Sequence, residues 1–283
     1  MHSYSVLVAN SILIYDHIVT LPEEITFIWC RPKARSAVLF FINRYVALLG
    51  NICGLVMDFL PVSDKSCSHY VLARQLLIYF QQFIVCLILT LRVYALYGGN
   101  KRLVKWIVTI GLGLAGAASA GTFGHFSSNE TILLGIGCYE TYTAKTAARL
   151  GLAWLALFVF ELLIFALTVY RIFRIRGLLR LSLVTRRNIV DIIFHDGAMY
   201  FGAMVLCNIP NILTYYSGSV ATRGSLATFT SCMSVTLISR LMLNLHKSIN
   251  AGIFSTPAQD GDHGLIVLTT RVDVQSAISS HHW

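Results

Sequence analysis

The sequence predicts an all-α integral membrane protein, a single seven-transmembrane helical bundle with its N-terminus outside and its C-terminus in the cytoplasm. Two observations predict this class. Of the 283 residues, 56% are hydrophobic and only 12% are charged, whereas soluble domains carry about 25% charged residues. The apolar residues also come in runs long enough to cross about 30 Å of hydrocarbon. The alternating ten-residue segments of an outer-membrane barrel do not occur.

Seven apolar runs are predicted to cross the membrane. They cover residues 4–20, 37–59, 71–96, 104–124, 149–170, 197–216 and 225–245, within a transmembrane domain predicted over residues 1–249. The sixth run contains Pro210, which a helical bundle tolerates as a kink. Residues 250–283 are mostly polar and predict a largely disordered cytoplasmic tail.

The Lys and Arg residues predict the direction of insertion. With the N-terminus outside, the inner segments hold fourteen of these residues and the outer segments hold four, as the positive-inside rule requires. The four outer residues are Lys65, Lys145, Arg149 and Arg223. The net charge of +9 is therefore a topology signal and not a surface for nucleic acid.

Two features of the predicted outer loops fit that direction. The sequon "NET" begins at Asn129, where glycosylation of an outer loop is expected. Cys67 precedes the third run and Cys138 lies between the fourth and fifth runs. Both cysteines would face an oxidising compartment, so the sequence predicts a Cys67–Cys138 disulfide.

The stretch "IYDHIVTLPEEITFIWCRPKAR", residues 14 to 35, is where the first run ends. Thr20 followed by Leu21, Pro22 and two glutamates is typical of a helix start. We therefore expect the first span to end near Thr20 and a short helix to follow along the inner leaflet, with Trp29 at the headgroups.

Ionisable residues inside a bilayer are costly and indicate functional sites. Several lie at the inner ends of the predicted spans and are expected to form one charge network: Asp16, Arg44, Arg92, Asp196 and Arg240. Breaking such a network is one way a seven-helix receptor switches. The alternative is that these residues reach the inner headgroups or only hold the fold together.

Glu161 lies near the middle of the fifth span, where it cannot reach the headgroups. It is expected to be neutral or to pair across the bundle, with Gln81 and Gln82 of the third span at a compatible depth. These three residues form a predicted midplane polar site. A ligand-binding or proton-linked role and a purely structural hydrogen bond both stay open.

The basic segment 171–187 alternates Arg with apolar residues, which predicts contact with an anionic leaflet or a cytoplasmic protein partner. No zinc or catalytic motif occurs. "GLGLAG" at 111–116 lies inside a predicted span, where no phosphate fits. The sequence therefore predicts no catalytic residue, no metal site and no cofactor.

Several segments resemble one protein family. "YDHIVTLPEEITFIW" and "VLFFINRYVALL", within residues 11–50, resemble the N-terminal signature of a fungal, mainly basidiomycete, membrane-protein family with domain of unknown function 6533. "LRVYALYGGNKR", "DGAMYF" and "SRLMLNL" also resemble that family. His195 departs from the Arg expected before Asp–Gly. The resemblance implies a seven-span fungal membrane protein and no established activity.

Three functions fit these features. A receptor-like sensor is favoured by the seven spans, the orientation and the basic inner loops, although span three lacks an acidic–Arg–aromatic triplet and span seven lacks Asn-Pro. A transporter or channel would use the midplane site around Glu161. A membrane scaffold would need neither the basic inner loops nor the midplane site for its function. An enzyme is the least favoured class. The ligand and the particular membrane are not predicted.

Overall fold

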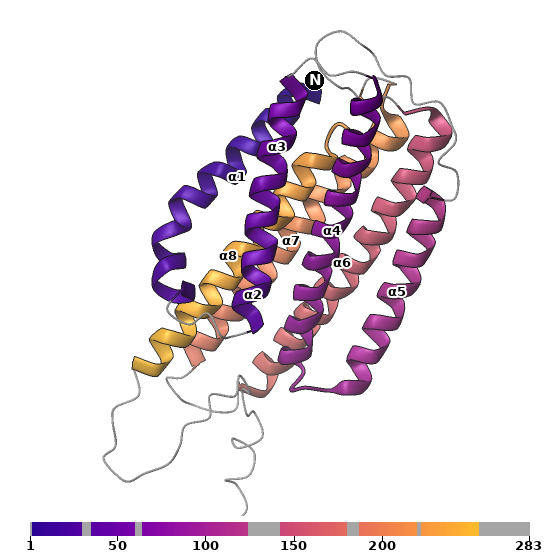
Figure 1. The fold of residues 1–283 in the computed structure, drawn as a ribbon. Helices are drawn as coiled ribbons and strands as arrows, with labels where there is room; N and C mark the ends of the chain where they lie inside the picture. Colours follow the sequence, from indigo (N-terminus) through magenta and orange to yellow (C-terminus); the bar gives the residue numbers. More distant parts are fainter. Residues whose placement is uncertain are drawn as a thin grey trace, which may run out of the picture.

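The computed structural model describes residues 2–29, 35–59, 64–123, 142–179, 187–219 and 222–254. All regular structure in these ranges is helical (Figure 1), which confirms the all-α class. The elements in chain order are α1 (His2–Glu24), the π-helical η1 (Ile25–Trp29), α2 (Arg35–Phe41), the π-helical η2 (Ile42–Val46), α3 (Ala47–Phe59), α4 (Asp64–Leu96), α5 (Lys101–Phe123), α6 (Ala144–Leu179), α7 (Arg187–Ser217) and α8 (Ala227–Phe254).

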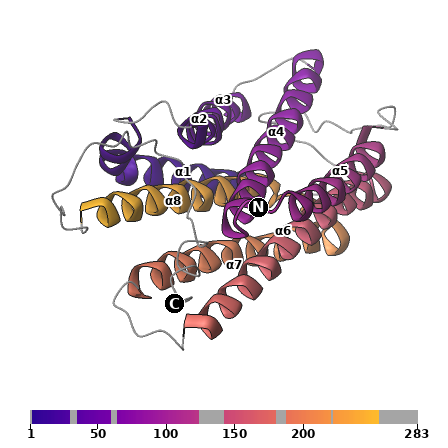
Figure 2. The ribbon, with the colours of Figure 1, turned by 90° about the horizontal axis from the view of Figure 1, so that it is seen from below.

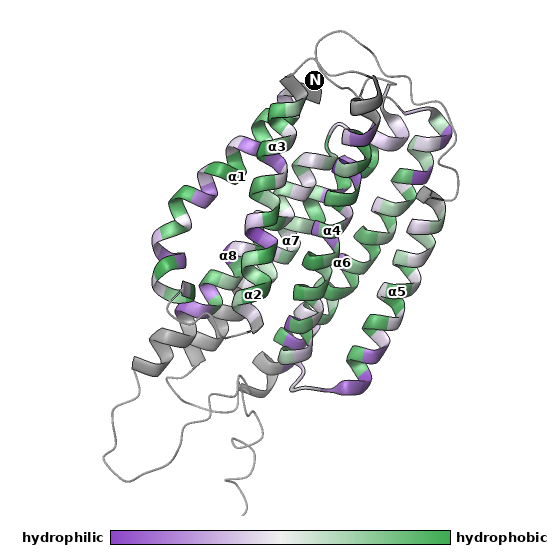
Figure 3. Cartoon of the chain, in the orientation of Figure 1, coloured by the Kyte–Doolittle hydropathy of each residue, from purple (hydrophilic) through white to green (hydrophobic). Residues whose placement is uncertain are grey.

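Six helical segments of the described ranges are long and apolar enough to cross a membrane. They are Tyr4–Trp29, Ser36–Met57, His69–Leu96, Lys101–Ala120, Ala144–Arg174 and Gly197–Ser217. Figure 3 shows apolar residues along most of α5 and α6, with a hydrophilic patch where α5 begins. Large apolar side chains such as Trp106 and Phe173 are well exposed on the outside of the bundle, where hydrocarbon would cover them. The seventh predicted span lies on α8, which is not among the six.

The first helix does not end near Thr20, so that prediction is wrong. α1 continues through Pro22 to Glu24, and η1 extends the same membrane-length segment to Trp29. The Thr20 hydroxyl donates to the carbonyl of Asp16 at 2.7 Å, a bond to the preceding turn that is typical of a helix interior and not of a helix cap. Within residues 21–29, the part of this stretch that the structure describes, the chain therefore continues the first helical segment instead of starting a separate helix along the inner leaflet.

The helices form one bundle whose core lies between α2, α4, α6, α7 and α8. Fully buried apolar side chains come from each of these helices: Phe40, Leu89, Ile164, Met204 and Ile238. Figure 2 shows α1 beside α8 and α5 beside α6, and the contacts between helices agree. α5 packs mainly on α6 and much less on α4. That uneven packing leaves room between α4 and α5.

The turn before α8 depends on a glycine. Gly224 has φ +68°, and a Cβ there would lie 2.9 Å from the Tyr215 ring. Tyr215 is buried and its hydroxyl accepts a hydrogen bond from Trp154 Nε1 at 3.2 Å. Gly98, in the turn after α4, has a similar φ of +66° but has no atom within 4 Å of the same position.

We expect Gly224→Ala to destabilise the protein more than Gly98→Ala. Both changes place a side chain in the left-handed region at about 1–2 kcal/mol, but only the first also displaces Tyr215. Thermal unfolding of the two variants in detergent checks the difference. Equal losses would contradict the close packing of Tyr215 on this turn.

Candidate functional site

Arg44, in η2, is the centre of a buried charge network. Its Nε lies 2.9 Å from Glu24 Oε2, and the Nε–H is donated to His17 Nδ1 at 3.0 Å. A second guanidinium nitrogen donates to the His17 carbonyl at 2.9 Å and to the Thr20 hydroxyl at 2.7 Å. The side chain of Arg44 is 3% exposed and that of Glu24 is 0% exposed. The two charges are thus removed from water and depend on each other.

Glu24 accepts hydrogen bonds from neutral donors in addition to its ion pair with Arg44. The Tyr45 hydroxyl donates to Glu24 Oε1 at 2.8 Å, and Trp29 Nε1 donates to the same oxygen at 2.9 Å. Glu24 ends α1 and Trp29 ends η1, while Tyr45 lies next to Arg44 in η2. π-Helical turns are frequent at functional sites because they reorient side chains. Here both π-helical turns supply residues to one acid.

Asp16 extends the network to α8. Arg240 Nε donates to Asp16 Oδ1 at 2.5 Å, and Arg44 lies 3.9 Å from Asp16 Oδ2. A more exposed ion pair also joins α1 to α8: Lys247 Nζ lies 3.0 Å from Glu23 Oε1. The structure therefore brings together three of the predicted network residues and fastens α1 to α8.

Arg92 does not lie with those acids. Its guanidinium stacks on the Phe201 ring at 5.8 Å and donates to the Leu241 carbonyl at 3.4 Å. Its described contacts are thus with α7 and α8, away from Asp16. Asp196 and His195 lie in α7, but their side chains fall outside the described residues. The full predicted network of five residues is therefore not assembled in the described part of the chain.

Glu24 was not among the residues predicted for the network, although its spacing from Asp16 and Thr20 indicated it. Asp16, Thr20 and Glu24 are four residues apart, so they lie along one face of a continuous helix. Pro22 obscured this spacing because proline usually marks the beginning or end of a helix. In the structure all three residues face η2 and contact Arg44.

The midplane acid Glu161 has a partner that was not predicted from the sequence. Asn208 of α7 donates to Glu161 Oε2 at 2.7 Å. Glu161 is 2% exposed and Asn208 is 0% exposed. A polar amide inside a predicted span, two residues before Pro210, was the available signal. The pair ties α6 to α7 in the middle of the bundle.

Gln81 and Gln82 point to different surroundings. Gln81 Oε1 accepts from the Ser231 hydroxyl of α8 at 2.7 Å, whereas Gln82 lines a cavity. Several buried polar atoms have no hydrogen-bond partner among the described residues: Glu161 Oε1, Gln81 Nε2, both amide atoms of Gln82 and both of Asn211. Buried groups of this kind are commonly satisfied by ordered water or by a ligand.

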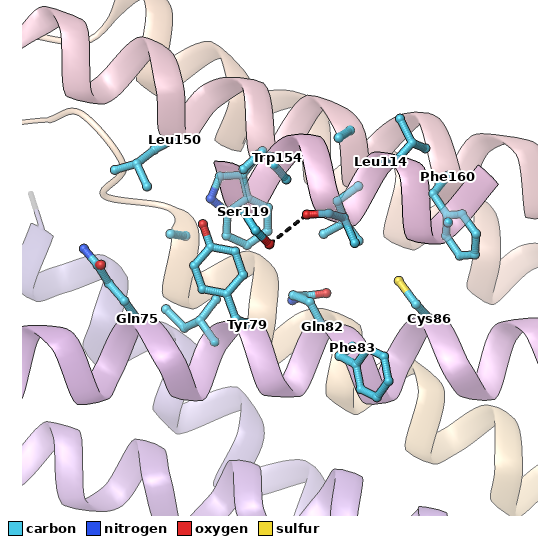
Figure 4. Close-up of a pocket in the computed structure, with 18 of the residues that line it drawn as sticks. Gln75, Tyr79, Gln82, Phe83, Cys86, Leu114, Ser119, Leu150, Trp154 and Phe160 are labelled. Atoms are coloured by element: carbon cyan, nitrogen blue, oxygen red, sulfur yellow. Dashed lines mark hydrogen bonds between the residues drawn. The ribbon is translucent and has the colours of Figure 1, made fainter. Parts of the chain in front are cut away.

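The cavity lies between α4, α5 and α6 and has a volume of about 540 Å³, within the drug-sized range of about 300–1,000 Å³. Its lining residues on α4 run from Arg74 to Thr90, which at 1.5 Å per residue is about 24 Å. Figure 4 shows Gln82, Cys86 and Trp154 around it. Ala227 and Thr228, at the start of α8, complete one end. The cavity is elongated and mostly apolar, and its volume is in the range of cavities that hold small molecules.

Other predicted features fall outside the described residues. Cys138 and Asn129 lie in the segment 124–141, and the side chain of Cys67 is also outside. Residues 180–186 of the basic segment 171–187 are outside as well. Within the described ranges no three His, Cys, Asp or Glu side chains are placed to hold a metal ion. The disulfide, the glycosylation and the absence of a metal site stay predictions.

The long apolar helices and their exposed apolar side chains define a multi-pass helical membrane protein. Residues 4–49 match the model of a family of unknown function, DUF6533. The match covers α1, η1, α2 and η2, which hold Asp16, Glu24 and Arg44, and it confirms the predicted N-terminal resemblance. No curated protein and no solved structure matches the chain.

Proposed function

We propose that the protein is a receptor-like sensor with seven membrane spans, an outside N-terminus and a cytoplasmic C-terminus. A small ligand binds in the cavity between α4, α5 and α6. The network around Arg44 responds at the other end of the bundle, and the basic segment 171–187 meets a cytoplasmic partner. The role is not catalytic. The fungal origin that the resemblance implies is part of the same proposal.

The position of α8 supports a seventh span. α8 runs through the bundle beside α1 and α7 (Figure 2). Its hydroxyl side chains are buried rather than exposed: Thr230, Ser231, Ser234 and Ser239. A helix that is surrounded by other helices does not need the apolar surface of one that faces lipid. Its polarity is therefore compatible with crossing the membrane.

The observation that carries the proposal is that one helix contacts both sites. α8 lines the cavity with Ala227 and Thr228 and binds Asp16 through Arg240. These two parts of α8 are twelve residues apart, which is about 18 Å along the helix. A rigid helix with two alternative positions is a physical means of coupling two sites. A shift of α8 at the cavity would move Arg240 relative to Asp16 and so change the network.

A large side chain in the cavity is expected to imitate a ligand. Ala118 lines the cavity, whereas Ala117 is exposed on the same helix and does not. We expect Ala118→Phe to increase hydrogen exchange of residues 20–29 and 42–46, since displacement of α8 weakens the network there. Hydrogen–deuterium exchange of the protein in lipid nanodiscs measures this, with Ala117→Phe as the matched control.

Two outcomes decide the test. Faster exchange in these segments for Ala118→Phe alone, with α6 and α7 unchanged, supports coupling between the cavity and the network. Equal exchange in both variants contradicts the sensor and favours a scaffold. Size-exclusion chromatography establishes that both variants fold before they are compared.

A transporter is the second candidate because of the polar layer in the middle of the bundle. Glu161, Gln81 and Asn211 are buried there with polar atoms that no described residue satisfies. A chain of such groups is typical of a path for protons or ions. The paired Glu161 variants described in the Discussion test this candidate.

A further inference from the structure

We infer that the cavity between α4, α5 and α6 binds a single-chain amphiphile with an acidic head group, of the class of long-chain carboxylic acids that carry an oxygen partway along the chain. The inference names the ligand class of the cavity that the proposed function uses. It rests on that proposal only for its biological meaning. Binding itself is measured separately.

The body of the cavity fits an extended apolar chain. Ile78, Leu114, Leu157 and Phe160 line it from three helices. The lining extends over about 24 Å of α4, while the volume stays at about 540 Å³. A cavity that is long for its volume favours one chain over a compact ring system or a lipid with two chains.

The cavity reaches the apolar outside of the bundle between α4 and α5. Phe83 and Leu112 line it, yet they are 60% and 65% exposed. Both are in segments that are long and apolar enough to cross a membrane, so this opening would face hydrocarbon. A ligand that partitions into the bilayer therefore has a direct way in.

One end of the cavity carries positive charge. Arg74 and Arg223 line it there. Arg74 donates to the Thr228 hydroxyl at 2.7 Å, and Arg223 donates to the carbonyls of Gly218 and Tyr142 at 3.2 Å. The described lining contains neither Asp nor Glu. An anionic head group complements the guanidinium of Arg223, whose described partners are uncharged carbonyl groups.

Gln82 specifies a further polar group on the chain. It is 7% exposed, lines the cavity, and neither amide atom has a hydrogen-bond partner among the described residues. Figure 4 shows its side chain pointing from α4 into the cavity. Gln82 lies two helical turns from Arg74, about 12 Å along α4. A hydroxyl or keto oxygen at that distance from the head would satisfy this amide.

The test uses a photoreactive long-chain carboxylic acid in phosphatidylcholine nanodiscs, with crosslinked residues mapped by mass spectrometry. We expect saturable labelling of residues 74–90 and 107–119. Unlabelled octadecanoic acid should compete with the probe, and its mid-chain hydroxy derivative should compete better. The alcohol with the same chain as octadecanoic acid should compete about tenfold less well than the acid, since one charge-assisted contact has that magnitude.

Variants separate the head from the chain. Arg223→Gln should weaken competition by the acid about tenfold and leave competition by the alcohol unchanged, which also shows that the cavity is intact. Lys145→Gln is the control, because it removes a charge from an exposed residue outside the lining. It should leave competition by the acid and by the alcohol unchanged. Ala118→Phe should abolish labelling. Gln82→Leu should remove the advantage of the hydroxy acid.

Several results would overturn the inference. Labelling that does not saturate or that ignores Ala118→Phe would mean that the probe only partitions into the bilayer. Equal competition by the acid and the alcohol would show that the site does not recognise an acidic head group, although the cavity would still bind a ligand. Competition by phosphatidic acid but not by the free acid would assign the site to a two-chain lipid. Specific labelling could also be found together with equal hydrogen exchange in Ala118→Phe and Ala117→Phe. That result would refute the proposed sensor function, whereas the inferred ligand class would stand.

Discussion

Arg44→Ala is expected to lower the free energy of unfolding by about 3–5 kcal/mol, the usual loss when one partner of a buried ion pair is removed. Glu24 is fully buried, and without Arg44 it retains only the neutral donors Tyr45 and Trp29. Asp16 retains Arg240. The loss should therefore come mainly from Glu24, measured as thermal unfolding in detergent beside wild type.

A double variant separates the unpaired charge from the lost packing. Arg44→Met with Glu24→Gln removes both charges and keeps similar volumes, so it should recover much of the stability lost in Arg44→Ala. Arg102→Ala, an exposed arginine at the start of α5, is the control and should stay within about 0.5 kcal/mol. A loss below about 1 kcal/mol for Arg44→Ala would mean that water reaches Glu24, contrary to its burial.

Glu161→Ala is expected to destabilise the protein and Glu161→Gln is not. Alanine leaves the buried amide of Asn208 without the acceptor it now contacts at 2.7 Å, and an unsatisfied buried donor costs about 1–3 kcal/mol. Glutamine keeps a carbonyl oxygen in the same place. Surface expression and thermal stability of both variants check this, with lipid-facing Leu162→Ala as the control.

The two Glu161 variants also decide between functions. If glutamine folds like wild type and alanine fails, Glu161 is a neutral hydrogen-bonding residue and the transporter candidate loses its main residue. If both fold normally, the carboxyl group is not needed for stability, and an ion or proton flux assay in liposomes becomes the relevant measurement. Failure of both variants would indicate that the carboxylate itself is required, which contradicts the simple hydrogen bond.

Part of the candidate site could be predicted from the sequence. Asp16, Arg44 and Arg240 were expected together because ionisable residues at the inner ends of neighbouring spans have few other partners, and the structure brings them into one network. Arg92 was placed by the same reasoning, yet its contacts are an aromatic ring and a carbonyl. Depth along a helix can be read from sequence, but the direction in which the side chain points depends on packing.

The class of the protein follows from its sequence alone. Long apolar segments with few charges have no stable arrangement in water, and in a bilayer only helices and closed barrels satisfy their backbone groups. Helical bounds near 37–59 and 71–96 followed from the same rule. The end of the first helix did not, because Pro22 and Thr20 usually mark a helix end and here lie inside one.

Which residues contact each other depends on the tertiary structure. Glu24 and Arg44 are twenty residues apart, and Glu161 and Asn208 are on different helices. The cavity is made by three helices and by the uneven packing of α5, so no single segment encodes it. Hydropathy is a sum over neighbouring residues, whereas pairing and cavities depend on the rotation of each helix about its axis, which is set by its neighbours in the bundle.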